Sequence, residues 1–179
     1  TKLSMAGACE AVVAVLRDNR GNPDTAAHAC WAVHYLADGH PSNRAQLATA
    51  GACREVAQAL SQHSRHEKLP ERACWAVVSL ATDSEDNRRS LGNAGACGGV
   101  VAALRTSSTE PLASSACAAV EYLATSSRDN AKKLARAAGS HDALLMLVRQ
   151  CHAPEEWKHD AEVAIMGGDF LPAFLGGSR

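Results

Sequence analysis

The chain has 179 residues, 46% of them hydrophobic, and a formal net charge of -1 at pH 7. A chain of this size and composition can bury a sizeable core, and its near-neutral charge gives it no overall attraction to nucleic acid or to an anionic membrane. No apolar run reaches the roughly 20 residues that a membrane span needs, so we expect no membrane segment.

Three short phrases recur along the chain in a fixed order. The first is AGAC, at 6–9, 50–53 and 94–97. The second is ACWAVHYLA at 29–37, which returns as ACWAVVSLA at 73–81 and as ACAAVEYLA at 116–124. The third is an Asn followed by a Leu: Asn43 with Leu47, Asn87 with Leu91, and Asn130 with Leu134. Periods of about 40 to 47 residues are typical of helical solenoids.

The apolar spacing inside each unit is helical. Between residues 24 and 37, Ala29, Cys30 and Val33 fall on one face of a helix, and strand alternation is absent. The short segment after Pro41 stops at Gly51, a residue that can take the left-handed conformation after a helix. A proline comes before each long segment, at Pro23, Pro70, Pro111 and Pro154. The unit is predicted to be a short helix, a glycine turn, a middle helix, a polar loop and a long third helix.

These phrases resemble armadillo repeat proteins, in arrays similar to those of importin-alpha and beta-catenin. The residues that carry the resemblance are the "N…L…AGA" of the first helix and turn, the apolar middle helix and the "A-C-W-A-V-x-x-L-A" of the third helix, over roughly residues 1 to 166. The resemblance implies an all-α, right-handed armadillo-type superhelix of about four three-helix repeats, forming a single domain over 1–179. We expect the repeats at about 1–39, 40–83, 84–126 and 127–168, with a C-terminal cap or partial repeat at 169–179.

The N-terminal end of the array is predicted to be uncovered. TKLSM supplies only the tail of a first helix, and a repeat is stabilised by its neighbours. We therefore expect that the chain is either part of a longer solenoid or self-associates through this end.

Six of the seven cysteines follow the repeat. Cys9, Cys53 and Cys97 share one position, Cys30, Cys74 and Cys117 share another, and Cys151 lies outside the scheme. The odd number and the absence of CxxC favour buried, reduced thiols that pack as small hydrophobes over disulfides, redox sensing or a metal site. Reduced thiols indicate an intracellular protein, in the cytoplasm or the nucleus.

A second stripe lies beside the core face of each third helix. In the proteins that this chain resembles, third helices line a concave groove that binds extended peptides, so the stripe is the predicted partner-binding groove. Its residues are His28, Trp31, Tyr35, Asp38, Arg72, Trp75, Ser79, Ser115, Glu121, Tyr122 and Asp160. The tryptophans either anchor a partner, with Tyr35, Trp75 and Tyr122 as a ladder, or wedge between adjacent third helices.

The resemblance fails at the position four residues after the tryptophan. Importin-type arrays carry an asparagine there, whose amide holds the peptide backbone. This chain has Tyr35, Ser79 and Tyr122 instead, and none of these side chains provides the donor and acceptor of an amide. The predicted groove also mixes acidic and basic residues, so we do not expect importin-like binding of basic localisation peptides.

Nothing in the sequence indicates catalysis. The chain has no G-x-S-x-G, no phosphate-binding G-x-x-x-x-G-K-[ST] and no HExxH. The pairs His63 with His66 and His28 with His34 lack the further ligands of a zinc site. We expect no catalytic residues, no metal and no cofactor.

The predicted function is a protein-protein interaction scaffold that binds a protein or an extended peptide along the third-helix groove. One alternative is an architectural spacer within a larger multidomain protein. The other is nucleic-acid binding, which the charge balance disfavours.

Overall fold

The computed structural model describes residues 7–166, and over this range the chain forms α-helices and no strand. The helices are α1 (Ala8–Asp18), α2 (Pro23–Ala37), α3 (Pro41–Ala50), α4 (Ala52–Gln62), α5 (Leu69–Ala81), α6 (Glu85–Asn93), α7 (Ala96–Thr106), α8 (Glu110–Ala124), α9 (Arg128–Ala138), α10 (His141–Gln150) and α11 (Glu155–Met166). Residues 1–6 and 169–179, for which we expected a first-helix tail and a cap or partial repeat, lie outside this range.

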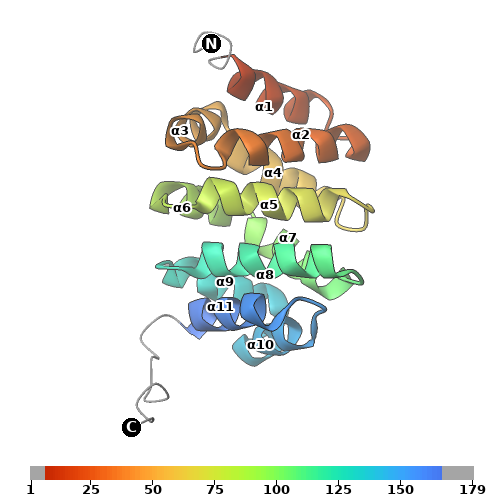
Figure 1. Ribbon diagram of the computed structural model, residues 1–179, viewed down its shortest axis with the longest axis vertical. Helices are drawn as coiled ribbons and strands as arrows, with labels where there is room; N and C mark the ends of the chain where they lie inside the picture. The colour runs from red at the N-terminus through yellow and green to blue at the C-terminus, as the bar shows by residue number, and fades with distance from the viewer. Residues whose placement is uncertain (1–6, 167–179) are drawn as a thin grey trace.

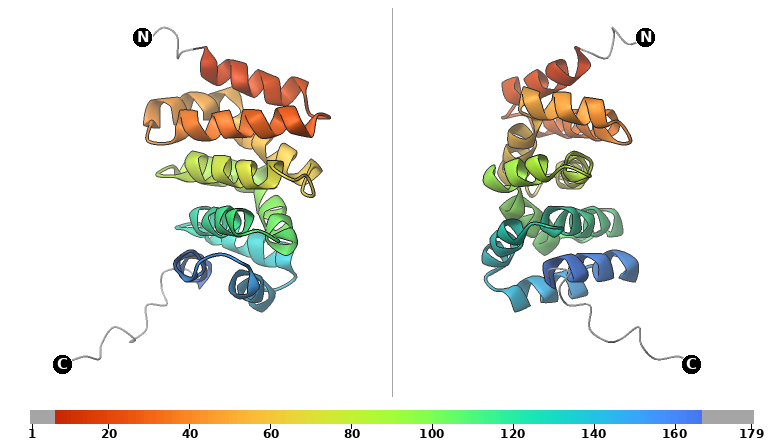
Figure 2. Two further views of the ribbon diagram at one scale, coloured as in Figure 1. Left: turned by 45° about the vertical axis from the view of Figure 1, so that its right-hand side comes forward. Right: turned by 90° about the vertical axis from the view of Figure 1, so that its left-hand side faces the viewer.

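The helices stack as repeating units from the N-terminal to the C-terminal end (Figure 1). Helices α3 to α5, α6 to α8 and α9 to α11 form three units of three helices, and α1 and α2 are the middle and third helices of the unit before them. The third helices α2, α5, α8 and α11 lie one above another in one layer, and the other helices form the layers behind them, as the side views of Figure 2 show. The predicted all-α solenoid is confirmed.

Small side chains pack the third-helix layer. Ala73 and Cys74 of α5 and Ala116 and Cys117 of α8 are all completely buried. All seven cysteines are free and buried. Burial raises the pKa of Cys74 to about 12, because the thiolate would lose its hydration. Cys74 therefore fills space as a small apolar group.

The recurring asparagines join consecutive units. Each lies buried near the start of a first helix and donates a side-chain hydrogen bond to a leucine carbonyl seven residues earlier, in the last turn of the preceding third helix. The pairs are Asn43 with Leu36 at 2.9 Å, Asn87 with Leu80 at 2.9 Å, and Asn130 with Leu123 at 3.0 Å. The last carbonyls of a helix have no partner within the helix, so each asparagine satisfies a group that would otherwise be buried without a hydrogen bond.

The turn between first and middle helices depends on glycine. Gly51 has φ 97° between α3 and α4, and Gly95 has φ 93° between α6 and α7. In this left-handed region a Cβ atom costs steric strain, so glycine allows the two helices to follow each other almost directly. The predicted glycine turn is present at both places.

We expect Asn87→Ala to lower the free energy of unfolding by about 1–3 kcal/mol, since it leaves the buried Leu80 carbonyl without its donor. Urea denaturation followed by circular dichroism measures the change. Ser90→Ala, at an exposed position of the same helix, is the control and should change stability by less than about 0.5 kcal/mol. Equal stability of the two variants would contradict a role for the asparagine in joining the units.

Candidate functional site

A row of rings crosses the third-helix layer. Trp31 stacks on His34 with 5.0 Å between ring centroids and meets Tyr35 edge-on at 4.9 Å. His34 lies 5.9 Å from Trp75 of α5, and Trp75 meets Trp157 of α11 edge-on at 6.0 Å. We call these five residues the aromatic row. It extends from α2 to α11 and therefore spans all four units.

The row passes over α8 because α8 carries small side chains at this point. Ala118 occupies the repeat position of Trp31 and Trp75, and it is completely buried. The alanine leaves room for Trp75 and Trp157 to meet from the two flanking helices. The ring contacts that link the units run through His34 and Trp157. The ladder of Tyr35, Trp75 and Tyr122 as partner anchors stays a prediction.

Two of the predicted groove residues are not on the surface. Ser115 is 0% exposed, and its hydroxyl donates to the Leu112 carbonyl at 3.0 Å. Ser79 is also buried, and its hydroxyl lies 2.6 Å from Nδ1 of His34. Neither serine is available to a partner, because neighbouring third helices cover this part of the stripe.

The surroundings of His34 favour its neutral form. Burial lowers the pKa of His34, and the charge of Asp38 and a backbone hydrogen bond at Trp75 oppose this shift only in part. The neutral ring joins α2 to α5 through its hydrogen bond with Ser79. In the second unit, Ser79 stands where importin-type arrays have a peptide-binding asparagine. Its side chain is used for this internal contact with His34.

The two tryptophans whose role the sequence left open are neither fully buried nor fully exposed. Trp31 and Trp75 are both half-buried, and Trp75 packs against the core. Tyr35 is 60% exposed at the end of the aromatic row. Aromatic side chains that keep one face accessible on a rigid support are favourable anchors for a partner.

Arg72 and His28 mark the end of the surface where the third helices begin. The guanidinium of Arg72 lies 3.3 Å from Nδ1 of His28 and 5.9 Å from the centroid of Trp31. A cation at this distance from an indole face is attracted by the ring. The positive group at this end is therefore already occupied by contacts within the chain.

Four carboxylates collect around Tyr122 at the opposite end. The pKa of Tyr122 is raised by burial first and then by the charges of Glu121, Asp83, Asp160 and Asp38. Asp38 directly follows α2, and Asp83 lies two residues after the end of α5. At these C-terminal ends the helix dipole adds negative potential. The charges of the predicted groove are thus separated, with Arg72 at one end and the carboxylates at the other.

Sequence reasoning missed Trp157 and Asp83. Trp157 lies outside the A-C-W-A phrase that carries Trp31 and Trp75, and the last unit has no such phrase. Asp83 lies one residue beyond the stripe and has φ 49°, which turns the chain sharply after α5. The signal for both was their residue type: a third tryptophan in a chain poor in aromatics, and an acidic residue at a helix end.

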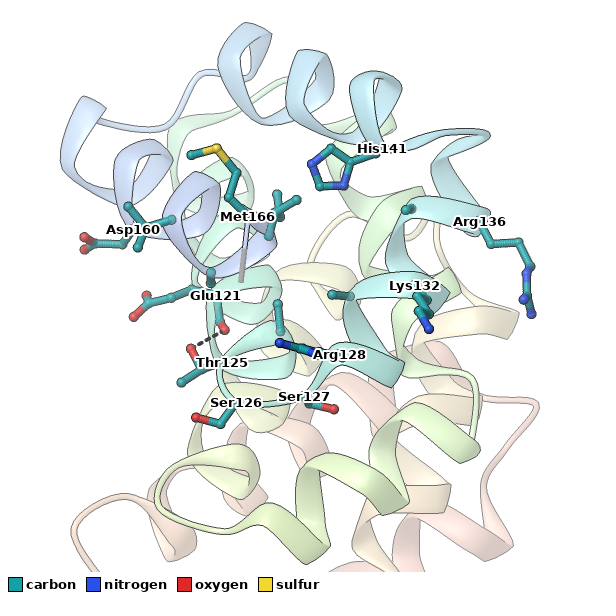
Figure 3. A pocket seen from close by; sticks show the side chains of 16 residues that line it. Glu121, Thr125, Ser126, Ser127, Arg128, Lys132, Arg136, His141, Asp160 and Met166 are labelled. Atoms are coloured by element: carbon teal, nitrogen blue, oxygen red, sulfur yellow. Dashed lines mark hydrogen bonds between the residues drawn. The ribbon is translucent and has the colours of Figure 1, made fainter. Parts of the chain in front are cut away.

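A cavity of about 1210 Å³ opens beside the carboxylates, between α8, α9 and α11 (Figure 3). Figure 3 shows Glu121 and Asp160 on the side formed by α8 and α11, and Lys132 and Arg136 on the side formed by α9. The walls of this cavity therefore carry opposite charges.

Within residues 7–166, no cluster of three or more His, Cys, Asp or Glu side chains is placed to hold a metal ion. No helix in that range is long and apolar enough to cross a membrane.

No protein-family model matches the sequence, and no curated protein matches it. Solved structures do match. A designed armadillo repeat protein in complex with the peptide (KR)4 is 26% identical and superimposes with a TM-score of 0.71 over 89% of this chain. This chain spans 64% of that designed protein's length. Computationally designed armadillo repeat proteins for modular peptide recognition are 26% identical, with a TM-score of 0.73 over 92% of this chain and 66% of theirs.

We expect Glu121→Gln to raise the melting temperature at pH 7. Burial and the nearby Asp160 raise the pKa of Glu121, so ionisation of this carboxyl costs stability in the folded state. The gain should be present at neutral pH and disappear as the pH falls through the raised pKa, where the wild-type side chain is protonated. Melting curves at pH 7 and pH 4 measure it.

Glu110→Gln is the matched control, because Glu110 is exposed in the first turn of the same helix. This variant should show no gain at pH 7, since a carboxylate there is favoured by the helix dipole. A gain for Glu121→Gln that is the same at both pH values would contradict the assignment.

Proposed function

Because the chain has an armadillo-like repeat fold, we propose that it is a non-enzymatic scaffold that binds an extended segment of a protein partner across α2, α5, α8 and α11. The observation that carries the proposal is the aromatic row, which continues over four units and lies beside the carboxylates around Tyr122. The fold is typical of binding scaffolds, and a structure similar to this chain is a designed armadillo protein in complex with (KR)4.

The surface supports a bound segment with two kinds of side chain. Apolar groups, or the aliphatic parts of lysine and arginine, can pack on the half-buried Trp31 and Trp75 and on the exposed Tyr35. Cationic head groups can pair with the carboxylates around Tyr122, although Lys132 and Arg136 lie across the cavity from Glu121 and Asp160. Our proposal therefore favours basic segments, contrary to the expectation from the mixed composition of the stripe.

Recognition would depend on side chains more than on the peptide backbone. The amide of importin-type arrays is replaced by Tyr35, Ser79 and Tyr122, and Ser79 is already bonded to His34. Without such an amide, register along the groove would be set by where the cations and apolar groups of the partner fit. The carboxylates also repel phosphate, which disfavours nucleic acid as the partner.

The seven free, buried cysteines support a reducing compartment for this interaction. We therefore propose that the scaffold acts inside the cell, in the cytoplasm.

We expect the fluorescein-labelled peptide (Lys-Arg)4 to bind, as measured by fluorescence anisotropy, and (Glu-Asp)4 not to bind. Replacing Asp38 and Asp83 together by asparagine should weaken binding about fivefold or more, because each exposed ion pair contributes about 0.5–1 kcal/mol. The affinity should also fall as salt is added. Asp142→Asn, at an exposed position on α10 away from the third helices, is the control for net charge.

Two outcomes would overturn the charge assignment. One is equal weakening, per charge removed, by Asp142→Asn and by the double substitution of Asp38 and Asp83, which would mean that only net charge matters. The other is binding of neither peptide to any variant, which would favour the architectural spacer.

We expect Tyr35→Ala to weaken (Lys-Arg)4 binding about fivefold or more while leaving the melting temperature unchanged, because Tyr35 is an exposed member of the aromatic row. Met146→Ala, at a 55% exposed residue of α10, is the matched control. A triple alanine variant of Trp31, Trp75 and Tyr122 should abolish binding, but it also removes packing, so its circular dichroism spectrum must be checked first. Unchanged affinity in Tyr35→Ala and in a folded triple variant would exclude the aromatic row as the binding surface.

A further inference from the structure

Two thiols meet at the junction between the last two units. Cys117 lies on α8, and Cys151 lies directly after α10 in the turn that leads to α11. Their Sγ atoms are 3.3 Å apart. Cys117 is completely buried, and Cys151 is 8% exposed. All seven cysteines lie in the described part of the chain, and this is the pair whose sulfurs are in hydrogen-bond contact.

The pair does not follow from the repeat. Cys117 occupies the position shared by Cys30 and Cys74, whereas Cys151 is the cysteine outside the scheme. In the second unit, Cys74 pairs with the hydroxyl of Ser115 instead. The fourth unit has thus placed an additional thiol against a packing cysteine of the third.

We propose that Cys117 and Cys151 form an oxidisable dithiol, which closes to a disulfide when the protein meets a peroxide. A disulfide has an S–S length of about 2.05 Å, so the sulfurs must approach by little more than about 1 Å. Cys151 lies in the non-helical stretch 151–154, where small backbone rotations can supply this movement without disturbing a helix.

Cys151 is the thiol placed to react first. It is the more exposed of the two, and a hydrogen bond from Cys117, a backbone hydrogen bond from Ala153 and the nearby charge of Lys158 lower the pKa of Cys151. The same contact and burial raise the pKa of Cys117. As a thiol, Cys151 donates to the Val148 carbonyl at 3.1 Å, and it gives up this bond when it ionises. Thiolate, not thiol, is the nucleophile toward peroxide.

The chemistry requires one peroxide for each disulfide. The Cys151 thiolate attacks one oxygen of hydrogen peroxide, the O–O bond breaks, and the proton lost by Cys151 ends in the water released, which leaves a sulfenic acid. The Cys117 sulfur then attacks the Cys151 sulfur, the S–O bond breaks, and the hydroxyl leaves as water with the Cys117 proton. Both sulfurs are oxidised, and the peroxide is reduced to two molecules of water.

The bond would fasten the third unit to the fourth. It joins residues 34 positions apart in the sequence and ties α8 to the turn before α11, which carries Trp157. A cross-link of this span restricts the unfolded chain, so the oxidised protein should be more resistant to heat.

The test compares the native protein before and after mild hydrogen peroxide. Free thiols are then blocked under denaturing conditions, and the protein is digested with trypsin and analysed by mass spectrometry without reduction. We expect the peptides 106–128 and 150–158 to be joined after oxidation and separate after dithiothreitol. The melting temperature of the oxidised protein should rise by about 5 °C or more.

Three variants decide the outcome. Cys117→Ser and Cys151→Ser should each abolish the cross-link and the thermal shift, whereas Cys74→Ser, at the repeat position of Cys117, should retain both. The same treatment in urea should give mixed pairings, which shows whether the fold selects the pair. The proposal is overturned if the folded protein forms no such cross-link, if other cysteines pair equally often, or if Cys151 is oxidised to sulfinic acid while Cys117 stays reduced.

Discussion

The close approach of the third helices is the constraint on which the rest of the structure depends. The contact between α5 and α8 is formed by small, completely buried side chains: Ala73 and Cys74 on α5, and Ala116 and Cys117 on α8. Larger side chains at these positions would hold the two helices apart. The main helix contacts lie between neighbouring units, so this spacing sets the whole surface. Where the side chain is smallest, at Ala118, the rings of the flanking helices meet across α8. The aromatic row is therefore a product of the packing and is not an independent feature.

The separation of charge follows from the same stacking. The ends of α2, α5 and α8 gather on one side of the layer, so the acidic residues at or near those ends act on Tyr122 together even though they are far apart in the sequence. Burial, and then the charge of Asp160, raise the pKa of Glu121. Keeping this carboxyl ionised therefore costs the folded chain stability. In the proposed function, a cationic partner would relieve this cost on binding.

Features that repeat in the sequence could be predicted, and features formed between units could not. Helical period, the turns at Gly51 and Gly95, and the burial of Cys30, Cys74 and Cys117 are all visible within one unit. The loss of Ser115 from the surface, the contact of His34 with Ser79 and the meeting of Trp75 with Trp157 depend on which side chains face each other across neighbouring units. The last unit also lacks the A-C-W-A phrase, so the sequence offered no register for α11.

The asparagine hydrogen bonds determine where the length of a unit can vary. Asn87 reaches the Leu80 carbonyl seven residues back, and Asn43 and Asn130 keep the same separation, so the corner from a third helix to the next first helix has a fixed length. The connection from middle to third helix carries no such requirement, and it occupies 63–68 in one unit but only 107–109 in the next. Inserted residues, whether natural or engineered, should therefore be tolerated best in that connection, where they leave the pitch of the array unchanged.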